Sequence, residues 1–207
     1  MTDHDEEPVR RGPGRPRDPG NDRAILDATM ELVRTAGYPA LTIDAVAQAA
    51  KVGRPTIYRR WPSKAALVIA VLPYLLQSPP PIDTGRLETD LVVLLRRHVS
   101  SMSSARIRRI LPGLMADIAE EPELEASFRA SWIEPWQEAV EQAIARAIER
   151  GEVREGLDAA TLAELFVGAG LYEVLVAGES GWRPSAEERI AAFVEGIASE
   201  DSRRTSS

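Results

Sequence analysis

Cysteine is absent from this chain of 207 residues, which excludes a disulfide framework and any thiolate metal site. Histidine is nearly absent as well. His4 lies in a polar, acidic N-terminal stretch and His98 on the apolar face of an expected helix, and neither belongs to a cluster with metal-ligand spacing. We therefore expect no metal and no cofactor.

The short motifs of common enzymes are also missing. Residues 178–181 (GESG) lack the final spacing of a nucleophile elbow. Residues 168–170 (GAG) fall in an expected helix with no preceding strand, so they do not form a dinucleotide-binding loop. We expect no enzymatic activity, and an all-helical enzyme is kept only as a rival hypothesis.

Long hydrophobic runs are absent too. The longest, Ala65 to Leu76, has 12 residues and contains Pro73, whereas a helix needs about 20 apolar residues to cross a bilayer. Met1 to Glu7 is acidic and lacks the basic and apolar regions of a secretory signal. We expect no membrane span and a cytoplasmic location.

Positive charge is scarce overall but concentrated at one end. The whole chain has a net charge of −7. Residues 9–70 nevertheless hold 11 basic and 5 acidic residues, a net +6, whereas residues 71–207 hold 14 basic and 23 acidic residues, a net −9. A cationic head on an acidic body is typical of a protein that binds phosphate with one end.

The stretch from Thr42 to Lys64 organises this head. Apolar residues at helical spacing follow Thr42, whose hydroxyl can cap the first of two short helices. Gly53 is expected where the chain changes direction, and Pro55 suits the first turn of a second helix, from about Arg54 to Trp61. This is the helix-turn-helix pattern, whose second helix enters the major groove of DNA.

Residues 50–64 (AKVGRPTIYRRWPSK) resemble the TetR family of bacterial transcriptional regulators at several independent positions. The family pattern runs from A-x-V through [LIV]-Y-x-[HYR]-[FW] to [SN]-K. Lys51 departs from it, because the family usually has glycine there. A lysine holds a left-handed turn only at some energetic cost, so we expect strain at Lys51.

The resemblance and the chemistry of DNA together give the candidate contacts. Near the start of the second helix, Arg54 and Thr56 are expected to reach base edges, with Arg59 next. The resemblance implies that Thr42, Tyr58 and Lys64 contact phosphates. Hydroxyl and ammonium groups at helix ends suit this role. Trp61 is expected in the core, and Arg60 suits either role.

Residues 1–20 are polar and rich in proline and glycine, which predicts a flexible basic arm. Within it, Gly14-Arg15-Pro16-Arg17 resembles the AT-hook, so Arg15 and Arg17 are candidates for the narrow minor groove of A·T-rich DNA. The alternative is a solvated basic tail with weak attraction to phosphate.

Every periodic segment of the chain is helical, which predicts an all-α protein. Asn21 or Asp22 should cap the first helix, and Pro112 should kink or split one of the later helices. The expected helices span residues 23–36, 63–76, 85–101, a segment around 107–118, 122–150, 159–177 and 185–198. The expected domains are the arm (1–20), a three-helix helix-turn-helix DNA-binding domain (21–71), a helical effector-binding and dimerisation domain (72–199) and a disordered tail (200–207).

The resemblance further implies a small-molecule site among the middle helices and dimerisation through the final pair, 159–177 and 185–198. The alternative is that this pair completes the core of the monomer. The candidates to line this site are Met102, Leu111, Met115, Phe128, Trp132, Trp136, Phe166 and Tyr172. Their side chains suggest a largely apolar, aromatic effector.

These expectations combine into one hypothesis. The chain is a repressor that binds a palindromic DNA operator as a homodimer and is released by a small, largely apolar effector of unknown identity. The basic arm supports an alternative, an architectural DNA-binding protein that prefers A·T-rich sequence and needs no effector.

Overall fold

The structure, a computed structural model, describes residues 19–76, 78–79, 81–102, 105–172 and 186–199. Within these ranges every regular element is a helix, apart from one isolated antiparallel bridge between Val153 and Ala198. The predicted all-α class is therefore confirmed. The helices are α1 Pro19–Ala36, α2 Ile43–Ala50, α3 Arg54–Tyr58, α4 Lys64–Leu75, α5 Leu87–Met102, α6 Ala105–Glu120, α7 Pro122–Phe128, the π-helix η1 Arg129–Ile133, α8 Glu134–Glu149, α9 Ala159–Tyr172 and α10 Ala186–Ile197.

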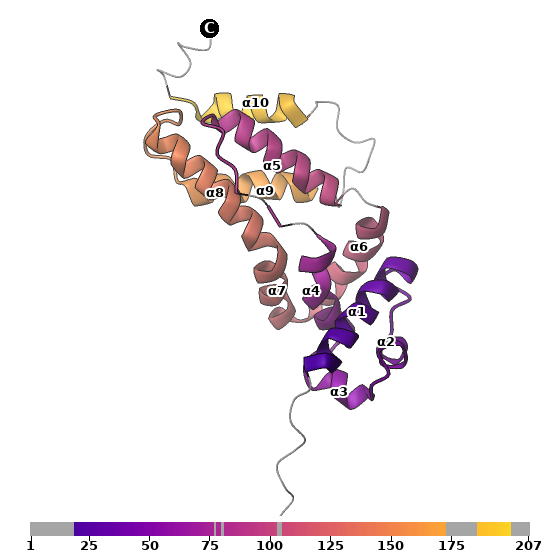
Figure 1. The fold of residues 1–207 in the computed structure, drawn as a ribbon. Coiled ribbons are helices and arrows are strands. Elements are labelled where there is room, and N and C mark those ends of the chain that lie inside the picture. The colour runs from indigo at the N-terminus through magenta and orange to yellow at the C-terminus, as the bar shows by residue number, and fades with distance from the viewer. Residues whose placement is uncertain (1–18, 77, 80, 103–104, 173–185, 200–207) are drawn as a thin grey trace, which may run out of the picture.

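The molecule has two parts, a head of α1–α4 and a body of α5–α10 (Figure 1). In the head, α1 packs against both α2 and α4, and the buried side chains of Ile25, Val46 and Ile57 join the helices in one apolar core. Helix α3 lies at the end of the molecule remote from α10 (Figure 1). The head therefore presents α3 at a free end of the molecule.

The body is built on α8, which packs against α9 and α5, while α10 packs on α5. Helix α6 and the segment α7–η1 contact α4, so the fourth helix of the head also belongs to the body's packing (Figure 1). Six of the twelve residues of α4 are buried, among them Leu67, Val68 and Leu72. The two parts are thus joined through a shared apolar core.

Several helix boundaries differ from those predicted. Helix α1 begins at Pro19 rather than Arg23, because proline suits a first helical turn, so Asn21 and Asp22 lie inside the helix and do not cap it. Helix α3 ends at Tyr58, although the backbone N–H of Trp61 still donates to the carbonyl of Ile57 at 2.9 Å. The predicted end at Trp61 therefore covers one further hydrogen-bonded turn beyond the bounds of α3.

Two prolines lie within the helices of the body, Pro112 in α6 and Pro135 in α8. Pro112 lies inside α6 without splitting it, because the buried face of Ile110, Leu111 and Leu114 holds the helix together. The predicted single helix 122–150 is instead widened at η1, where the N–H of Glu134 reaches the carbonyl of Arg129. Pro135 has no N–H to continue the α-helical ladder, which accounts for the π-turn before it.

No helix in the described ranges combines the length and apolar character required to cross a bilayer.

Candidate functional site

The helix-turn-helix is held at both ends by side-chain caps. The hydroxyl of Thr42 accepts a hydrogen bond from the N–H of Ala45 at 3.1 Å, and the hydroxyl of Ser63 accepts from the N–H of Ala66 at 3.2 Å. The predicted cap at Thr42 is confirmed, and Ser63 caps α4 in the same way. They fix where α2 and α4 begin, and hence where Thr42 and Lys64 stand on the surface.

The turn between α2 and α3 depends on Lys51 rather than on Gly53. Lys51 has φ +55° and ψ +40°, the left-handed region, and its N–H donates to the carbonyls of Ala47 and Gln48. Gly53 lies in this turn as predicted, but its φ of −76° and ψ of +146° are angles that any residue adopts, so the turn does not require glycine there. Lys51 therefore holds a left-handed conformation at the position where the family usually has glycine, which carries an energetic cost for a residue with a Cβ atom.

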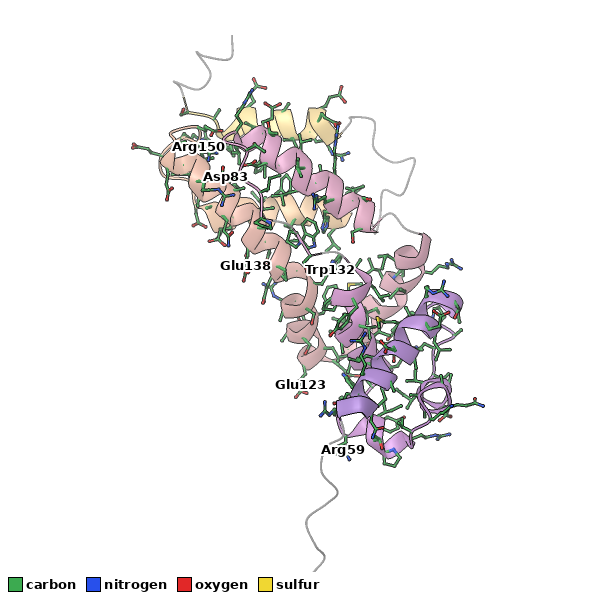
Figure 2. The ribbon with its side chains drawn as sticks, in the orientation of Figure 1. Arg59, Asp83, Glu123, Trp132, Glu138 and Arg150 are labelled. Atoms are coloured by element: carbon green, nitrogen blue, oxygen red, sulfur yellow. The ribbon has the colours of Figure 1, made fainter. Side chains whose placement is uncertain are left out.

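Helix α3 buries one side and exposes the other. Ile57 is completely buried, while Arg54, Tyr58 and Arg59 are exposed and Thr56 is half-buried. Arg59 projects from the lower end of the head (Figure 2). The structure therefore gathers four of the predicted DNA contacts on or beside one helical turn, with Thr42 and Lys64 at the starts of the flanking helices.

Two arginines of this region already have acidic partners. Arg54 forms an ion pair with Asp44 of α2, and Arg60 forms one with Asp22 of α1. The Arg60 pair crosses to another helix of the head, which favours a structural role for this residue. The arm residues Arg15 and Arg17 lie outside the described residues.

Lys64 makes a contact that sequence reasoning missed. Its Nζ lies 4.1 Å from the centroid of the Tyr38 ring, a cation–π contact. The hydroxyl of Tyr38 donates to Oδ2 of Asp117 in α6 at 2.5 Å, and burial together with this hydrogen bond raises the pKa of Tyr38. The only sequence signal was the position of Tyr38 directly after Gly37, the glycine with φ +77° that ends α1.

Helix α6 also approaches Tyr38 through Gly113. A Cβ added at Gly113 would lie 2.8 Å from Cδ1 of the Tyr38 ring, closer than real Cβ atoms come. Glycine is therefore required at this position by the close approach of the two segments. The head and the body meet here through Tyr38, Gly113 and Asp117.

The predicted effector residues do not all lie together. Phe128, Trp132 and Trp136 form one buried aromatic group, in which the rings of Phe128 and Trp132 are 5.1 Å apart at 60°. Figure 2 shows Trp132 in the interior of the molecule, between the helices of the body. Of the predicted effector-binding residues, these three are the ones that the structure brings together in one buried group.

The remaining predicted wall residues are spread over other helices. Leu111 is buried and Met115 half-buried on α6, and nothing is described of the Met102 side chain. Phe166 packs on Phe193 of α10, with ring centroids 5.8 Å apart. Tyr172 is 53% exposed at the end of α9.

His98 joins the aromatic group, and sequence reasoning had not counted it as a site residue. Its ring stacks on Trp132 at 6.1 Å and meets Trp136 edge-on at 4.7 Å. Burial lowers the pKa of His98 to about 4, so the imidazole is neutral at pH 7. The signal in the sequence was a polar residue in register with Leu87, Leu91, Leu94 and Leu95.

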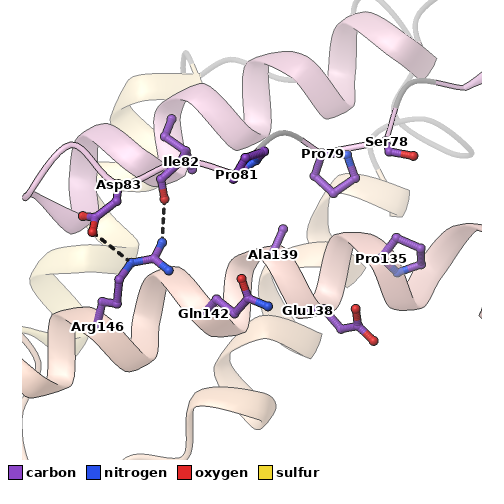
Figure 3. A pocket seen from close by; sticks show the side chains of 10 residues that line it. All are labelled: Ser78, Pro79, Pro81, Ile82, Asp83, Pro135, Glu138, Ala139, Gln142 and Arg146. Carbon is purple, nitrogen blue, oxygen red and sulfur yellow. Dashed lines mark hydrogen bonds and ion pairs between the residues drawn. The ribbon is translucent and has the colours of Figure 1, made fainter.

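A separate groove of about 520 Å³ runs between the segment before α5 and α8 (Figure 3). It is lined by Ser78, Pro79, Pro81, Ile82, Asp83, Pro135, Glu138, Ala139, Gln142 and Arg146. Arg146 closes one end, donating to the carbonyl of Ile82 at 2.5 Å and pairing with Asp83 at 3.5 Å. None of the predicted effector residues lines this groove.

Comparison with known proteins covers both parts of the chain. Residues 25–71 match the bacterial regulatory proteins of the tetR family, and residues 81–194 match the tetracyclin repressor-like C-terminal domain. An uncharacterized HTH-type transcriptional regulator of Bacillus subtilis, YdeS, is 31% identical over 170 residues, 80% of this chain and 84% of that protein. The DNA-binding transcriptional repressor TetR of Mycobacteroides abscessus is 36% identical over 84 residues, 38% of this chain and 44% of the repressor.

A solved structure agrees with these matches. The crystal structure of the TetR family transcription regulator SCO0332 has a TM-score of 0.65 and 26% identity, and the match covers 86% of this chain and 99% of that one. Proteins of this family are DNA-binding regulators and not enzymes. The helix-turn-helix, the capped starts of α2 and α4 and the matches over both domains show that this chain belongs to the TetR family of DNA-binding transcriptional regulators.

Proposed function

We propose that this regulator is a repressor that binds a palindromic operator as a homodimer and is released by a small, largely apolar effector. The observation that carries the proposal is the joint between head and body. Tyr38 contacts Lys64, next to the recognition helix, and also Asp117 and Gly113 of α6 in the effector domain. A displacement of α6 would therefore change the position of the DNA-contacting residues.

In the bound state, α3 enters the major groove. Arg54 and Thr56 contact base edges there, with Arg59 beside them. Thr42, Tyr58 and Lys64 contact phosphates on either side, and Arg15 and Arg17 of the arm reach an adjacent minor groove. Because Arg54 is paired with Asp44 in the free protein, contact with a base requires Arg54 to exchange that partner.

A homodimer forms through α9 and α10 in this proposal. Leu165 is 62% exposed and Tyr172 is 53% exposed on α9, and exposed Gly168 lies between them at helical spacing. Large apolar side chains at this exposure favour a partner surface. A second copy of α9 and α10 would cover them in a four-helix bundle.

The effector binds among the body helices, against the aromatic group of Phe128, Trp132 and Trp136 and the nearby face of α6. A ligand changes DNA binding only if it prefers one of two dimer geometries. Two recognition helices must stand about 34–36 Å apart to enter successive major grooves. In this proposal the effector shifts α6 and α4 and spoils that spacing. Repression is favoured because the similar protein of Mycobacteroides abscessus is named a repressor.

Footprinting tests this function, using DNA upstream of the regulator's own gene and its neighbours. A discrete palindromic site is expected, protected by the wild type but not by Leu165→Glu at the same concentration, because that variant should remain monomeric. Alanine at Glu123, an exposed residue of α7, provides a control that should protect the site fully. Broad protection of A·T-rich DNA would favour the architectural alternative, and no protection would contradict both.

A further inference from the structure

Among the residues that the structure describes, three polar atoms of the aromatic group have no hydrogen-bond partner. They are Nδ1 and Nε2 of His98 and Nε1 of Trp132. His98 is only 5% exposed and Trp132 only 3% exposed. The large majority of buried side-chain polar atoms in folded proteins have a partner, so three unpartnered atoms in two stacked rings require a reason.

The backbone around these rings is specialised. Trp132 belongs to the π-turn η1, and such turns are frequent at functional sites. On the opposite side, Gly170 of α9 leaves room for the imidazole, because an added Cβ would lie 3.1 Å from Cδ2 and 3.4 Å from Nε2 of His98. A glycine inside a helix is less favourable than alanine, so α9 is less stable at Gly170 than it would be with a larger residue there.

We propose that His98 and Trp132 are the polar anchor of the effector site, and that they select an uncharged molecule with an apolar body and one hydroxyl or carbonyl oxygen. The inference rests on the proposed effector-binding function and names the chemistry of the effector. A neutral imidazole offers one donor and one acceptor, and the indole offers one donor. A hydroxyl oxygen can accept from the indole N–H and donate to an imidazole nitrogen.

The uncharged neighbours of His98 disfavour a charged ligand. The ring neighbours of His98 are Trp132 and Trp136, and the glycine beside it brings no charge. A carboxylate entering this group would lose its water without gaining a cation in exchange. The lowered pKa of His98, about 4, agrees with a site that disfavours charge. The aromatic rings accept the apolar body of the ligand.

Hydrogen-bonding selectivity should be large because the protein's polar atoms are already out of water. On binding, only the ligand's own oxygen is desolvated, and the unpartnered atoms gain partners. We expect an alcohol to bind about tenfold more tightly than a hydrocarbon with the same body.

The test uses three probes with one tolyl body: toluene, p-cresol and p-toluate. Each is titrated into the full-length protein, and the indole N–H of Trp132 and the imidazole of His98 are followed by NMR. p-Cresol should bind about tenfold more tightly than toluene, and p-toluate more weakly than p-cresol. The preference for p-cresol should fall below about twofold in His98→Leu and in Trp132→Phe, since each removes part of the anchor.

His98→Gln is the matched control, because its amide keeps a donor and an acceptor and should retain the preference. Equal affinity for toluene and p-cresol in the wild type, a preference unchanged in His98→Leu and Trp132→Phe, or tightest binding of p-toluate would each overturn the inference. Operator binding is measured separately. If p-cresol binds at His98 and the affinity for DNA does not change, the polar anchor is supported and the proposed release of DNA is contradicted. If an effector releases DNA equally from wild type and His98→Leu, the proposed release is supported and the polar anchor is contradicted.

Discussion

The hydroxyl of Tyr38 donates a hydrogen bond of 2.5 Å to Oδ2 of Asp117, which lies 79 residues further along the chain. Tyr38 belongs to the connection between α1 and α2, and Asp117 to α6 of the C-terminal domain. The Tyr38 ring also lies beneath Nζ of Lys64. One side chain thus contacts both Lys64, beside the recognition helix, and helix α6, which the proposed effector would displace.

Removing the hydroxyl of Tyr38 should measure how much its hydrogen bond to Asp117 stabilises the protein. Tyr38→Phe keeps the ring beneath Lys64 and leaves the Asp117 carboxylate without its donor. We expect the free energy of unfolding, measured with urea, to fall by about 1.5–3 kcal/mol, the range for a hydrogen bond to a charged group. Asp117→Ala removes the acceptor and should lose a similar amount, and the double variant should lose little more than either single variant. Fully additive losses would show that the two residues do not interact.

Gly113 provides a steric test of the same joint. In Gly113→Ala the new methyl group would meet the buried Tyr38 ring at 2.8 Å, so either the ring or α6 must move. Overpacking of this kind costs about 1–3 kcal/mol, which should appear as a lower melting temperature. Gly196→Ala is the control, because its added Cβ meets no atom within 4 Å. A melting temperature for Gly113→Ala at or above that of the wild type would contradict the close approach.

The local signals in the sequence predicted local structure well. Thr42 and Ser63 cap the helices they precede, because a cap depends only on a residue and the three that follow it. The turn was only partly predictable. Glycine was expected to supply the unusual backbone, but Lys51 adopts φ +55° while Gly53 stays extended. The hydrogen bonds that Lys51 makes to α2 outweigh its intrinsic preference.

The site in the body was less predictable. Phe128, Trp132 and Trp136 follow each other at steps of four, so their common face could be inferred from the sequence alone. The partners that α5 and α9 bring to this face, His98 and Gly170, depend on packing between distant segments. The π-turn at Trp132 follows from Pro135, whose effect on the preceding turn was not considered.

Replacing Lys51 by glycine should stabilise the head. Glycine occupies the left-handed region without the clash of a Cβ atom, so Lys51→Gly is expected to raise the free energy of unfolding by about 0.5–1 kcal/mol. Lys51→Ala is the comparison, because it removes the ammonium group and keeps the strain. If the alanine variant gained as much stability as the glycine variant, the backbone explanation would be wrong.

Lys64 should contribute to DNA binding without contributing to sequence choice. Lys64→Met removes the charge and keeps an apolar chain over Tyr38. We expect weaker binding to every operator sequence, and a slope of log affinity against log salt that is less steep by about one. Arg96→Met on α5 removes the same charge far from the head, where Arg96 pairs with Glu187, and should leave the slope unchanged. Identical slopes for wild type and Lys64→Met would remove Lys64 from the phosphate contacts.

His98 should make the stability of the protein depend on pH. Its pKa is about 4 in the folded chain and near 6.5 in the unfolded chain, so the unfolded state binds the proton more readily. Stability from the neutral imidazole is therefore fully present above pH 6.5 and is lost as the pH falls toward 4. Between pH 7 and pH 5 the wild type should lose about 2 kcal/mol more than His98→Leu, as measured by urea unfolding at each pH. Parallel pH profiles for the two proteins would show that His98 binds a proton as easily in the folded protein as in water. That result would contradict the lowered pKa of His98.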